Sequence, residues 1–307
     1  MIRNTAIMRG TLQRAARLAF AAACLAGCVE GGGDFSGPQA PRFEASAAGR
    51  PQPRLALVLG SGGARGFAHI GALKVLDENG IRPDLVVGAS VGSIVGALYA
   101  SGMSAAQIEK LAYSLGFLDL FDFNMVLKEP ATGRRTQELV SAHVGGRMIE
   151  QLPIAFAAAA TRERDGALVI FNRGDTGIAV RASGASPEQF EPVRISGERY
   201  IDGDEASPVP IRAARSLGAR VVIAVDVSAF VEDTPRGVPA AWVAKDARRA
   251  KQVATEAPEA DVLIHPNIGY YAGHNEEYRH RVIDAAERAT RARLPELLAA
   301  AARAASK

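Results

Sequence analysis

Residues 55–101 read LALVLGSGGARGFAHIGALKVLDENGIRPDLVVGASVGSIVGALYAS, and this stretch decides the fold. Residues 55–59 form a short apolar run that ends in glycines, which is typical of a strand buried on both faces. Residues 85–88 repeat the pattern. Each apolar run is followed by a helical stretch, the first at residues 67–79 and the second at residues 91–101. The order strand, helix, strand, helix with short connections predicts a parallel sheet covered by helices.

The rest of the chain adds strands that make this sheet mixed. Ser104 and Gln107 form a capping box for a third helix that reaches about Leu115. Residues 193–201 read as two short strands around a turn at Ser196-Gly197. The other expected elements are strands at residues 154–160, 168–171 and 220–226, a helix at 211–217 closed by Gly218, and a helix from about 276 to the end that is interrupted near Pro295. The predicted fold class is α/β, with three layers (α/β/α), a central mostly parallel sheet and C-terminal helices.

The N-terminal segment reads as an export signal, because arginines at positions 3, 9, 14 and 17 precede an apolar run that is too short to span a bilayer. The run ends in Leu25-Ala26-Gly27-Cys28, which resembles the lipobox of bacterial lipoprotein signals. In that signal the cysteine is acylated and becomes the first mature residue. The resemblance implies a signal peptide over residues 1–27 and a lipid anchor at Cys28; an ordinary cleaved signal with an incidental cysteine is the alternative.

Position 29 is valine and not aspartate, which by the same resemblance implies an outer-membrane protein that faces the periplasm. Residues 28–53 are rich in Gly, Ala, Ser and Pro and have no hydrophobic period, so they read as a flexible tether. We expect folding to begin near Arg54. The main domain is expected over residues 54–228, with a helical C-terminal extension of the same domain over residues 229–307.

Composition excludes several classes of function. The net charge is only +3 and several arginines fall in the leader, so no nucleic-acid-binding surface is indicated. Cys24 lies within the leader, so a mature chain would keep only Cys28. One cysteine excludes a disulfide and a cysteine-based zinc site. No residue pattern specifies an oligomeric state.

The strongest chemical motif is Gly88-Ala89-Ser90-Val91-Gly92, a G-x-S-x-G placed between a predicted strand and a predicted helix. A serine at such a sharp turn exposes its hydroxyl, and the small flanking residues allow a substrate to approach. Ser90 is therefore a candidate nucleophile. Taken alone, the same residues could merely form a tight turn.

A second glycine-rich segment, residues 60–66, follows the first predicted strand and opens the first helix. Backbone N–H groups there should converge near the same sheet edge and suit a tetrahedral oxyanion. A dinucleotide site is disfavoured, because that fold needs an acidic residue at the end of the second strand, where Gly88 stands. A phosphate-binding P-loop is disfavoured as well, because Gly66-Phe67 replaces its Gly-Lys.

None of the five histidines has a setting that suits the base of a serine hydrolase. His69 lies one turn into the first helix and reads as a packing or capping residue. We expect the other four, at positions 143, 265, 274 and 280, to be surface or structural residues.

Three motifs together resemble the patatin-like phospholipase family: residues 62–66 (GGARG), residues 88–92, and Asp202-Gly203. Residues 181–193 also resemble the family's segment before its aspartate. The resemblance implies a patatin-like α/β/α sandwich and a Ser-Asp dyad, with Ser90 as nucleophile and Asp202 as general base. It further implies an oxyanion hole formed by the N–H groups of Gly62, Gly63 and Ala64, with Arg65, Gly66, Gly88, Gly92 and Gly203 completing the motifs.

The implied function is hydrolysis of carboxylic ester bonds in phospholipids, lysophospholipids or related lipids through an acyl-enzyme, with no metal or cofactor required. Membrane attachment would come from lipidated Cys28. A thioesterase or an acyltransferase on the same dyad is one alternative. An inactive lipoprotein that binds lipid or scaffolds an envelope complex is another.

The sequence departs from the family pattern at two positions: Ser61 stands where many members have glycine, and Asp204 stands where glycine or alanine is usual. We expect Asp204 to face solvent or to cap the helix after Pro208. The apolar stretch 118–126 could line an acyl-chain groove or form a lid, although core packing is favoured. Arg134 and Arg135 could meet phosphate head groups, but an exposed turn is the simpler interpretation.

Overall fold

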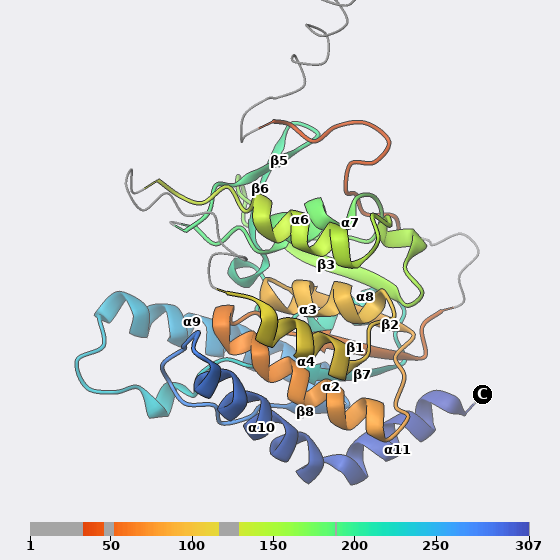
Figure 1. The fold of residues 1–307 in the computed structure, drawn as a ribbon, viewed down its shortest axis with the longest axis vertical. Helices are drawn as coiled ribbons and strands as arrows, with labels where there is room; N and C mark the ends of the chain where they lie inside the picture. Colours follow the sequence, from red (N-terminus) through yellow and green to blue (C-terminus); the bar gives the residue numbers. More distant parts are fainter. Residues whose placement is uncertain (1–32, 46–51, 117–128, 188, 307) are drawn as a thin grey trace, which may run out of the picture. The chain divides into compact units, whose positions relative to one another are not determined.

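The computed structural model describes residues 33–45, 52–116, 129–187 and 189–306, and residues Asp34–Lys307 form one unit (Figure 1). At its centre is β1 (Leu55–Leu59), a strand of five buried residues. It is paired in parallel with β2 (Leu85–Ala89) on one side and β7 (Val221–Val225) on the other. Apolar residues on both faces are what a strand between two helical layers requires.

The sheet contains eight strands among the described residues, in the order β5-β6-β3-β2-β1-β7-β8, with β4 beside β3. The neighbouring strands β3, β2, β1, β7 and β8 are paired in parallel, whereas β4, β5 and β6 join the sheet by antiparallel pairing. The prediction of a mixed, mostly parallel sheet is therefore confirmed. The remaining strands are β3 (Ala155–Arg162), β4 (Leu168–Phe171), β5 (Val193–Ile195), β6 (Glu198–Asp202) and β8 (Val262–Ile264).

Alternate residues of the central strands face two different helical layers. Leu55, Leu57 and Leu59 belong to a core that includes residues of α2 (Ala68–Glu78), α3 (Val91–Ala100) and α4 (Ala105–Ser114). Ala56 and Val58 belong to the opposite core, which includes residues of α8 (Ile211–Ser216) and α9 (Ala240–Glu256). The three-layer α/β/α architecture is therefore confirmed.

The C-terminal helices belong to the core that contains residues of α2, α3 and α4. α10 (Glu276–Ala292) runs beside α2 (Figure 1), and α11 (Leu294–Ala305) follows it after the predicted interruption near Pro295. The contact with α2 is close at Gly71, where an added Cβ would lie 2.1 Å from the Ile283 carbonyl oxygen. Only glycine permits two helix backbones to approach in this way.

Several local elements differ from the sequence-based prediction. Residues 262–264 form the edge strand β8, although the chain beyond residue 227 reads as helical. Two helices were not predicted: α6 (Arg134–His143) and α7 (Thr176–Ser183). Arg134 and Arg135 are exposed in the first turn of α6, so the prediction of a turn at this position is wrong. The apolar stretch 118–126 lies outside the described residues.

The predicted tether is partly folded. Phe35 forms a parallel bridge with Ile195 of β5, and Arg42 forms an antiparallel bridge with Arg173. Glu44 adds an ion pair, with 3.1 Å between its Oε2 and Nε of Arg173. The prediction that folding begins near Arg54 is therefore wrong for residues 34–44, because backbone hydrogen bonds order a segment whose composition has no hydrophobic period. Cys28 lies outside the described residues.

Candidate active site

Ser90 occupies the turn between β2 and α3, as the G-x-S-x-G motif predicts. Its φ of 52° is unusual, since among the described residues only Ser196 shares a positive φ without being glycine. The strained position is held by a hydrogen bond of 2.9 Å from the Ser90 N–H to Oγ of Ser183, which itself donates to the Ala159 carbonyl of β3. Strain of this kind is characteristic of residues whose side chain has a function.

Asp202 lies at the end of β6 and reaches Ser90 across the sheet. The Ser90 hydroxyl donates to Oδ2 of Asp202 at 2.8 Å, although the two residues are 112 positions apart in the chain. Strand pairing explains the contact, because β3 pairs with β2 at Ala89 and with β6 at Asp202. Thr161 of β3 also donates to the Asp202 carbonyl at 2.7 Å, which fixes the end of β6.

The electrostatic setting of Asp202 disfavours its charged form. Burial raises its pKa first, the Asp204 carboxylate raises it further, and together they bring it to about 7. Three groups act in the opposite direction: the Asp204 N–H, which donates to Oδ1 at 2.9 Å, the Ser90 hydroxyl, and the ammonium of Lys245 on α9. A carboxylate with a pKa near neutrality is suited to exchange a proton with a substrate.

The glycine-rich loop lies beside Ser90. It leads from β1 into a short 3-10 helix, η1 (Gly63–Phe67), and then into α2. Gly63 and Ala64 are the first two residues of η1, and the first hydrogen bond of its turn is donated by the Arg65 N–H to the Gly62 carbonyl. The N–H groups of Gly63 and Ala64 are therefore not used within the helix. Gly63 has a φ of 54°, and space is open where its Cβ would be, which leaves this part of the loop accessible.

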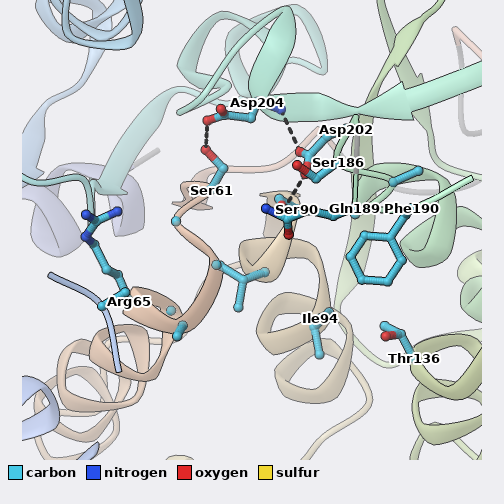
Figure 2. Close-up of a pocket in the computed structure, with 18 of the residues that line it drawn as sticks. Ser61, Arg65, Ser90, Ile94, Thr136, Ser186, Gln189, Phe190, Asp202 and Asp204 are labelled. Carbon is cyan, nitrogen blue, oxygen red and sulfur yellow. Dashed lines mark hydrogen bonds between the residues drawn. The ribbon is translucent and has the colours of Figure 1, made fainter. Parts of the chain in front are cut away.

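A cavity of about 1290 Å³ connects these groups, and Ser90, Asp202, Gly62, Gly63 and Ala64 all line it. Figure 2 shows Ser90 and Asp202 together on its wall, with Ile94, Thr136 and Phe190 farther along. Much of the lining is apolar and comes from α3 and α4, including Ile94, Val95, Leu98, Ile108 and Leu111. An elongated apolar molecule with one polar reacting group fits such a cavity.

The remaining motif residues shape the framework around the site. Gly92 permits α3 to pack on β1, because a Cβ there would lie 2.1 Å from the Leu59 carbonyl oxygen. Gly66, Gly88 and Gly203 have equally little space for a side chain. Arg65 donates to the Tyr270 carbonyl, and burial lowers the pKa of its guanidinium. Arg65 therefore ties the loop to the C-terminal part of the chain.

Asp204 does not face solvent or cap a helix, so the sequence-based expectation is wrong. Its side chain is only 12% exposed, and its Oδ1 lies 3.0 Å from Nε of Arg249 on α9. Ser61 also donates a hydrogen bond to Asp204 through its hydroxyl. The two positions that depart from the family pattern are thus in contact with each other (Figure 2).

Sequence reasoning missed the contribution of α9. Lys245 and Arg249 belong to a helix rich in lysine and arginine, a pattern that usually marks a solvated surface. Ser183 was also missed as the residue that holds the Ser90 N–H. Only the three-dimensional structure brings these residues to the site.

His69 is a packing residue, as expected. It is fully buried, and its Nε2 lies 2.7 Å from the Gly60 carbonyl oxygen. A carbonyl only accepts, so Nε2 carries the proton and His69 holds the end of β1. Burial lowers the pKa of this histidine to about 4, which keeps the ring neutral.

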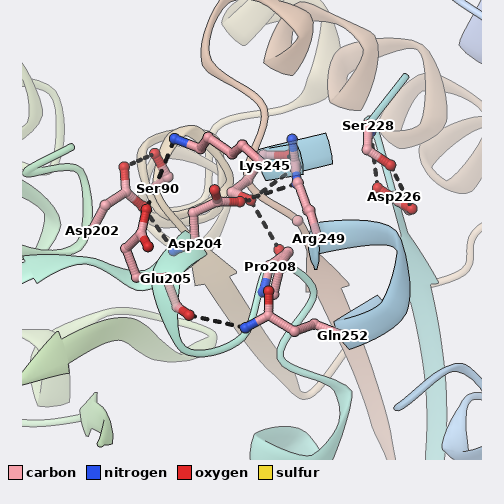
Figure 3. Close-up of polar contacts among 12 residues, drawn as sticks. Ser90, Asp202, Asp204, Glu205, Pro208, Asp226, Ser228, Lys245, Arg249 and Gln252 are labelled. Carbon is pink, nitrogen blue, oxygen red and sulfur yellow. Dashed lines mark hydrogen bonds and ion pairs between the residues drawn. The ribbon is translucent and has the colours of Figure 1, made fainter. Parts of the chain in front are cut away.

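Another serine, Ser228, also contacts a carboxylate. Its hydroxyl donates to Asp226 at 2.9 Å (Figure 3). Nε2 of His265 lies 3.4 Å from the same hydroxyl. In a Ser-His-Asp triad the aspartate orients the histidine nitrogen that faces away from the serine. Asp226 does not do this and instead contacts the serine itself. The cluster is thus a structural turn after β7.

No helix in the described part of the chain combines the length and apolar character needed to cross a bilayer.

Three comparisons with known proteins place the site in context. A solved structure, VipD from Legionella pneumophila, has a similar fold, with a TM-score of 0.55 and 15% identity over 85% of this chain and 70% of that chain.

Relatives by sequence include an uncharacterised NTE family protein of Mycobacterium tuberculosis, which is 34% identical over 64% of this chain and 56% of its own length. The chain thus spans about half the length of this relative. Lysophospholipase NTE1 of Coccidioides immitis is 34% identical over 59% of this chain and 12% of its own length. Human patatin-like phospholipase domain-containing protein 6 is 35% identical over 56% of this chain and 13% of its own.

The family model described as patatin-like phospholipase matches residues 57–215, more than half of the chain. These residues contain the glycine-rich loop, the serine turn and Asp202. The chain belongs to the patatin-like phospholipase family.

Proposed function

We propose that this protein is a serine acyl hydrolase that cleaves carboxylic ester bonds of phospholipids or lysophospholipids. The observation that carries the proposal is the hydrogen bond of 2.8 Å from the Ser90 hydroxyl to Asp202, on the wall of a largely apolar cavity. Membership of the patatin-like phospholipase family supports the same chemistry.

In the first half of the reaction, Oγ of Ser90 attacks the ester carbonyl carbon while Oδ2 of Asp202 accepts the serine proton. The tetrahedral intermediate carries its negative charge on the former carbonyl oxygen. The N–H groups of Gly62, Gly63 and Ala64 stabilise that charge, helped by their position at the start of η1. The Ser90 N–H takes no part, because it donates to Ser183.

When the tetrahedral intermediate collapses, the ester bond breaks and Asp202 returns its proton to the departing alcohol. The acyl group remains on Ser90. In the second half, Asp202 accepts a proton from water, the hydroxide attacks the acyl carbon, and the same N–H groups stabilise the second oxyanion. Collapse releases the fatty acid, and the proton passes from Asp202 to Oγ of Ser90. One carboxylate of near-neutral pKa serves both directions of proton transfer.

The lining of the cavity supports a lipid as substrate. Its apolar side chains from α3 and α4 offer a surface for an acyl chain, and the volume is somewhat above the range usual for small-molecule sites. Lys245, which also lines the cavity, places a positive charge near Ser90 and Asp202, and this charge suits an anionic phosphate.

The proposal is tested by incubating the purified protein with mixed membrane lipids and measuring the products by mass spectrometry. We expect free fatty acids and the corresponding lysolipids or glycerophosphodiesters to accumulate with the wild type and not with Ser90→Ala. Release that persists in Ser90→Ala would contradict the assignment. Transfer of acyl groups to another lipid without release of fatty acid would instead indicate an acyltransferase.

We further propose that Cys28 is the lipidated first residue of the mature protein, which is anchored in the outer membrane and faces the periplasm. The support is the motif Leu25-Ala26-Gly27-Cys28 followed by Val29. Mass spectrometry of the mature N-terminus, after expression in a bacterium with two membranes, should find an acylated Cys28. Cys28→Ser should move the protein from the membrane fraction to the soluble fraction. An unmodified Cys28, or cleavage elsewhere, would refute this proposal.

A further inference from the structure

We infer that Arg249 of α9 is a positioning residue of the active site, which joins the glycine-rich loop to the turn after Asp202 and balances the charge of Asp204. This inference rests on the proposed function. It adds a residue that lies beyond the part of the chain matched by the family model, which ends at residue 215.

Arg249 contacts both loops at once. Its Nε lies 3.0 Å from Oδ1 of Asp204, and its Nη2 donates to the carbonyl oxygen and, at 2.9 Å, to the hydroxyl of Ser61. The hydroxyl of Ser61 in turn donates to Asp204. Figure 3 shows Arg249 and Asp204 facing each other, with Ser90 and Asp202 beyond Asp204.

The three side chains are withdrawn from water. Ser61 is 1% exposed and Arg249 is 7% exposed, while Asp204 keeps only a small accessible surface. A buried charge is costly unless it is paired, so each member of this network depends on the other two. The Ser61 N–H adds a further bond of 2.8 Å to the Pro208 carbonyl, beyond the turn that carries Asp204.

The contact with the Ser61 carbonyl has a direct consequence for the proposed oxyanion donors. That carbonyl and the N–H of Gly62 belong to the same peptide group, which is planar and trans, so they point in opposite directions. By holding the Ser61 oxygen, Arg249 sets the direction of the Gly62 N–H. Gly62 is also packed closely against Val227, since a Cβ built on Gly62 would lie only 2.7 Å from the Val227 side chain. This packing limits the movement of the Gly62 backbone.

The contact with Asp204 has a consequence for the proposed base. Asp202 is faced by the Ser90 hydroxyl, by Asp204 and by Lys245, and Lys245 is itself 3.8 Å from Glu205. The Asp204 carboxylate opposes the ionisation of Asp202, and Arg249 supplies the opposite charge beside that carboxylate. Removing Arg249 would leave Asp204 uncompensated, so Asp202 would bind its proton at higher pH.

The test uses the full chain and five variants: Arg249→Met, Arg249→Lys, Asp204→Asn, the double variant Arg249→Met with Asp204→Asn, and Lys251→Met. Lys251 is exposed on the same helix and is the matched control for loss of one positive charge. For each protein, kcat/KM for a soluble p-nitrophenyl ester and the rate of fluorophosphonate labelling are measured against pH. Thermal unfolding reports whether each variant is folded.

We expect Arg249→Met to move the acid limb of both profiles upward by about one pH unit and to lower kcat/KM at pH 7 by about tenfold or more. The double variant should return the acid limb to the wild-type position or below it, since no uncompensated carboxylate remains. Lys251→Met should resemble the wild type. Arg249→Lys should keep the acid limb but lower kcat, because an ammonium cannot reproduce the forked contacts with both loops.

An acid limb that is the same in the wild type and Arg249→Met, with Ser90-dependent labelling retained, would overturn this inference and leave the proposed function standing. A double variant with the acid limb of Arg249→Met would also overturn it, because charge balance would then be excluded. A wild type without Ser90-dependent hydrolysis or labelling would overturn both the proposed function and this inference.

Discussion

Asp202→Asn is expected to lower kcat/KM for ester hydrolysis by about 10⁴-fold, because an amide cannot accept the serine proton. The substitution preserves shape, and the amide oxygen can still accept the hydrogen bond from the Asp204 N–H. A folded but inactive enzyme is therefore the expected result. Steady-state kinetics with a soluble ester, together with a thermal unfolding curve, measure both properties.

Asp204→Asn is the matched control, two residues along the same turn. The proposed mechanism requires ionised Asp202, whose pKa is raised to about 7, so wild-type activity should increase as pH rises through about 7. Removing the Asp204 charge lowers the pKa of Asp202 and should extend activity to lower pH. We expect only a modest loss at the optimum. Equal loss in both variants would indicate a carboxylate pair that acts as a unit, and loss in Asp204→Asn alone would contradict Asp202 as the base.

A fluorophosphonate probe is expected to label Ser90, and Ser90→Ala should remove the labelling completely. The reason is that Ser90 combines a strained turn, a hydrogen bond to a carboxylate and neighbouring N–H donors that stabilise the tetrahedral adduct. Gel fluorescence followed by peptide mass spectrometry identifies the labelled residue.

Ser228 provides the control for this experiment, because its hydroxyl also donates to an aspartate, at 2.9 Å from Asp226. It does not line the cavity at Ser90. Ser228→Ala should therefore keep full labelling. Adducts on Ser228, or labelling that survives Ser90→Ala, would show that a carboxylate contact alone is sufficient for reactivity and would contradict the site proposed here.

The elements around Ser90 could be predicted because their signals are local. Residues 55–59 and 85–89 are apolar on both faces, and the Ser104 capping box marks the start of α4. The proximity of Ser90 and Asp202 came from a family resemblance and not from local signals, since it depends on the register of β3 with two other strands.

Not every missed element lacks such signals, since Asp175 caps the start of α7, but β8 and residues 34–44 do lack them. β8 has only three residues, and its pairing with β7 determines it more than its composition does. Residues 34–44 are ordered by backbone bridges, which any composition can form. Arg249 resembles the other charged residues of α9 in sequence, and only its contacts with Ser61 and Asp204 distinguish it.

The position of β1 between β2 and β7 affects how the protein is made. A growing chain that ends at β6 already contains Ser90 and Asp202, yet one edge of β1 has no partner strand. The glycine-rich loop then lacks the hydrogen bond of 2.9 Å from the Gly60 N–H to the Val225 carbonyl and that of 2.8 Å from the Ser61 N–H to the Pro208 carbonyl. Pairing between segments so distant in the chain is slow to form. The loop beside Ser90 therefore gains these contacts only after β7 has been made and has paired with β1.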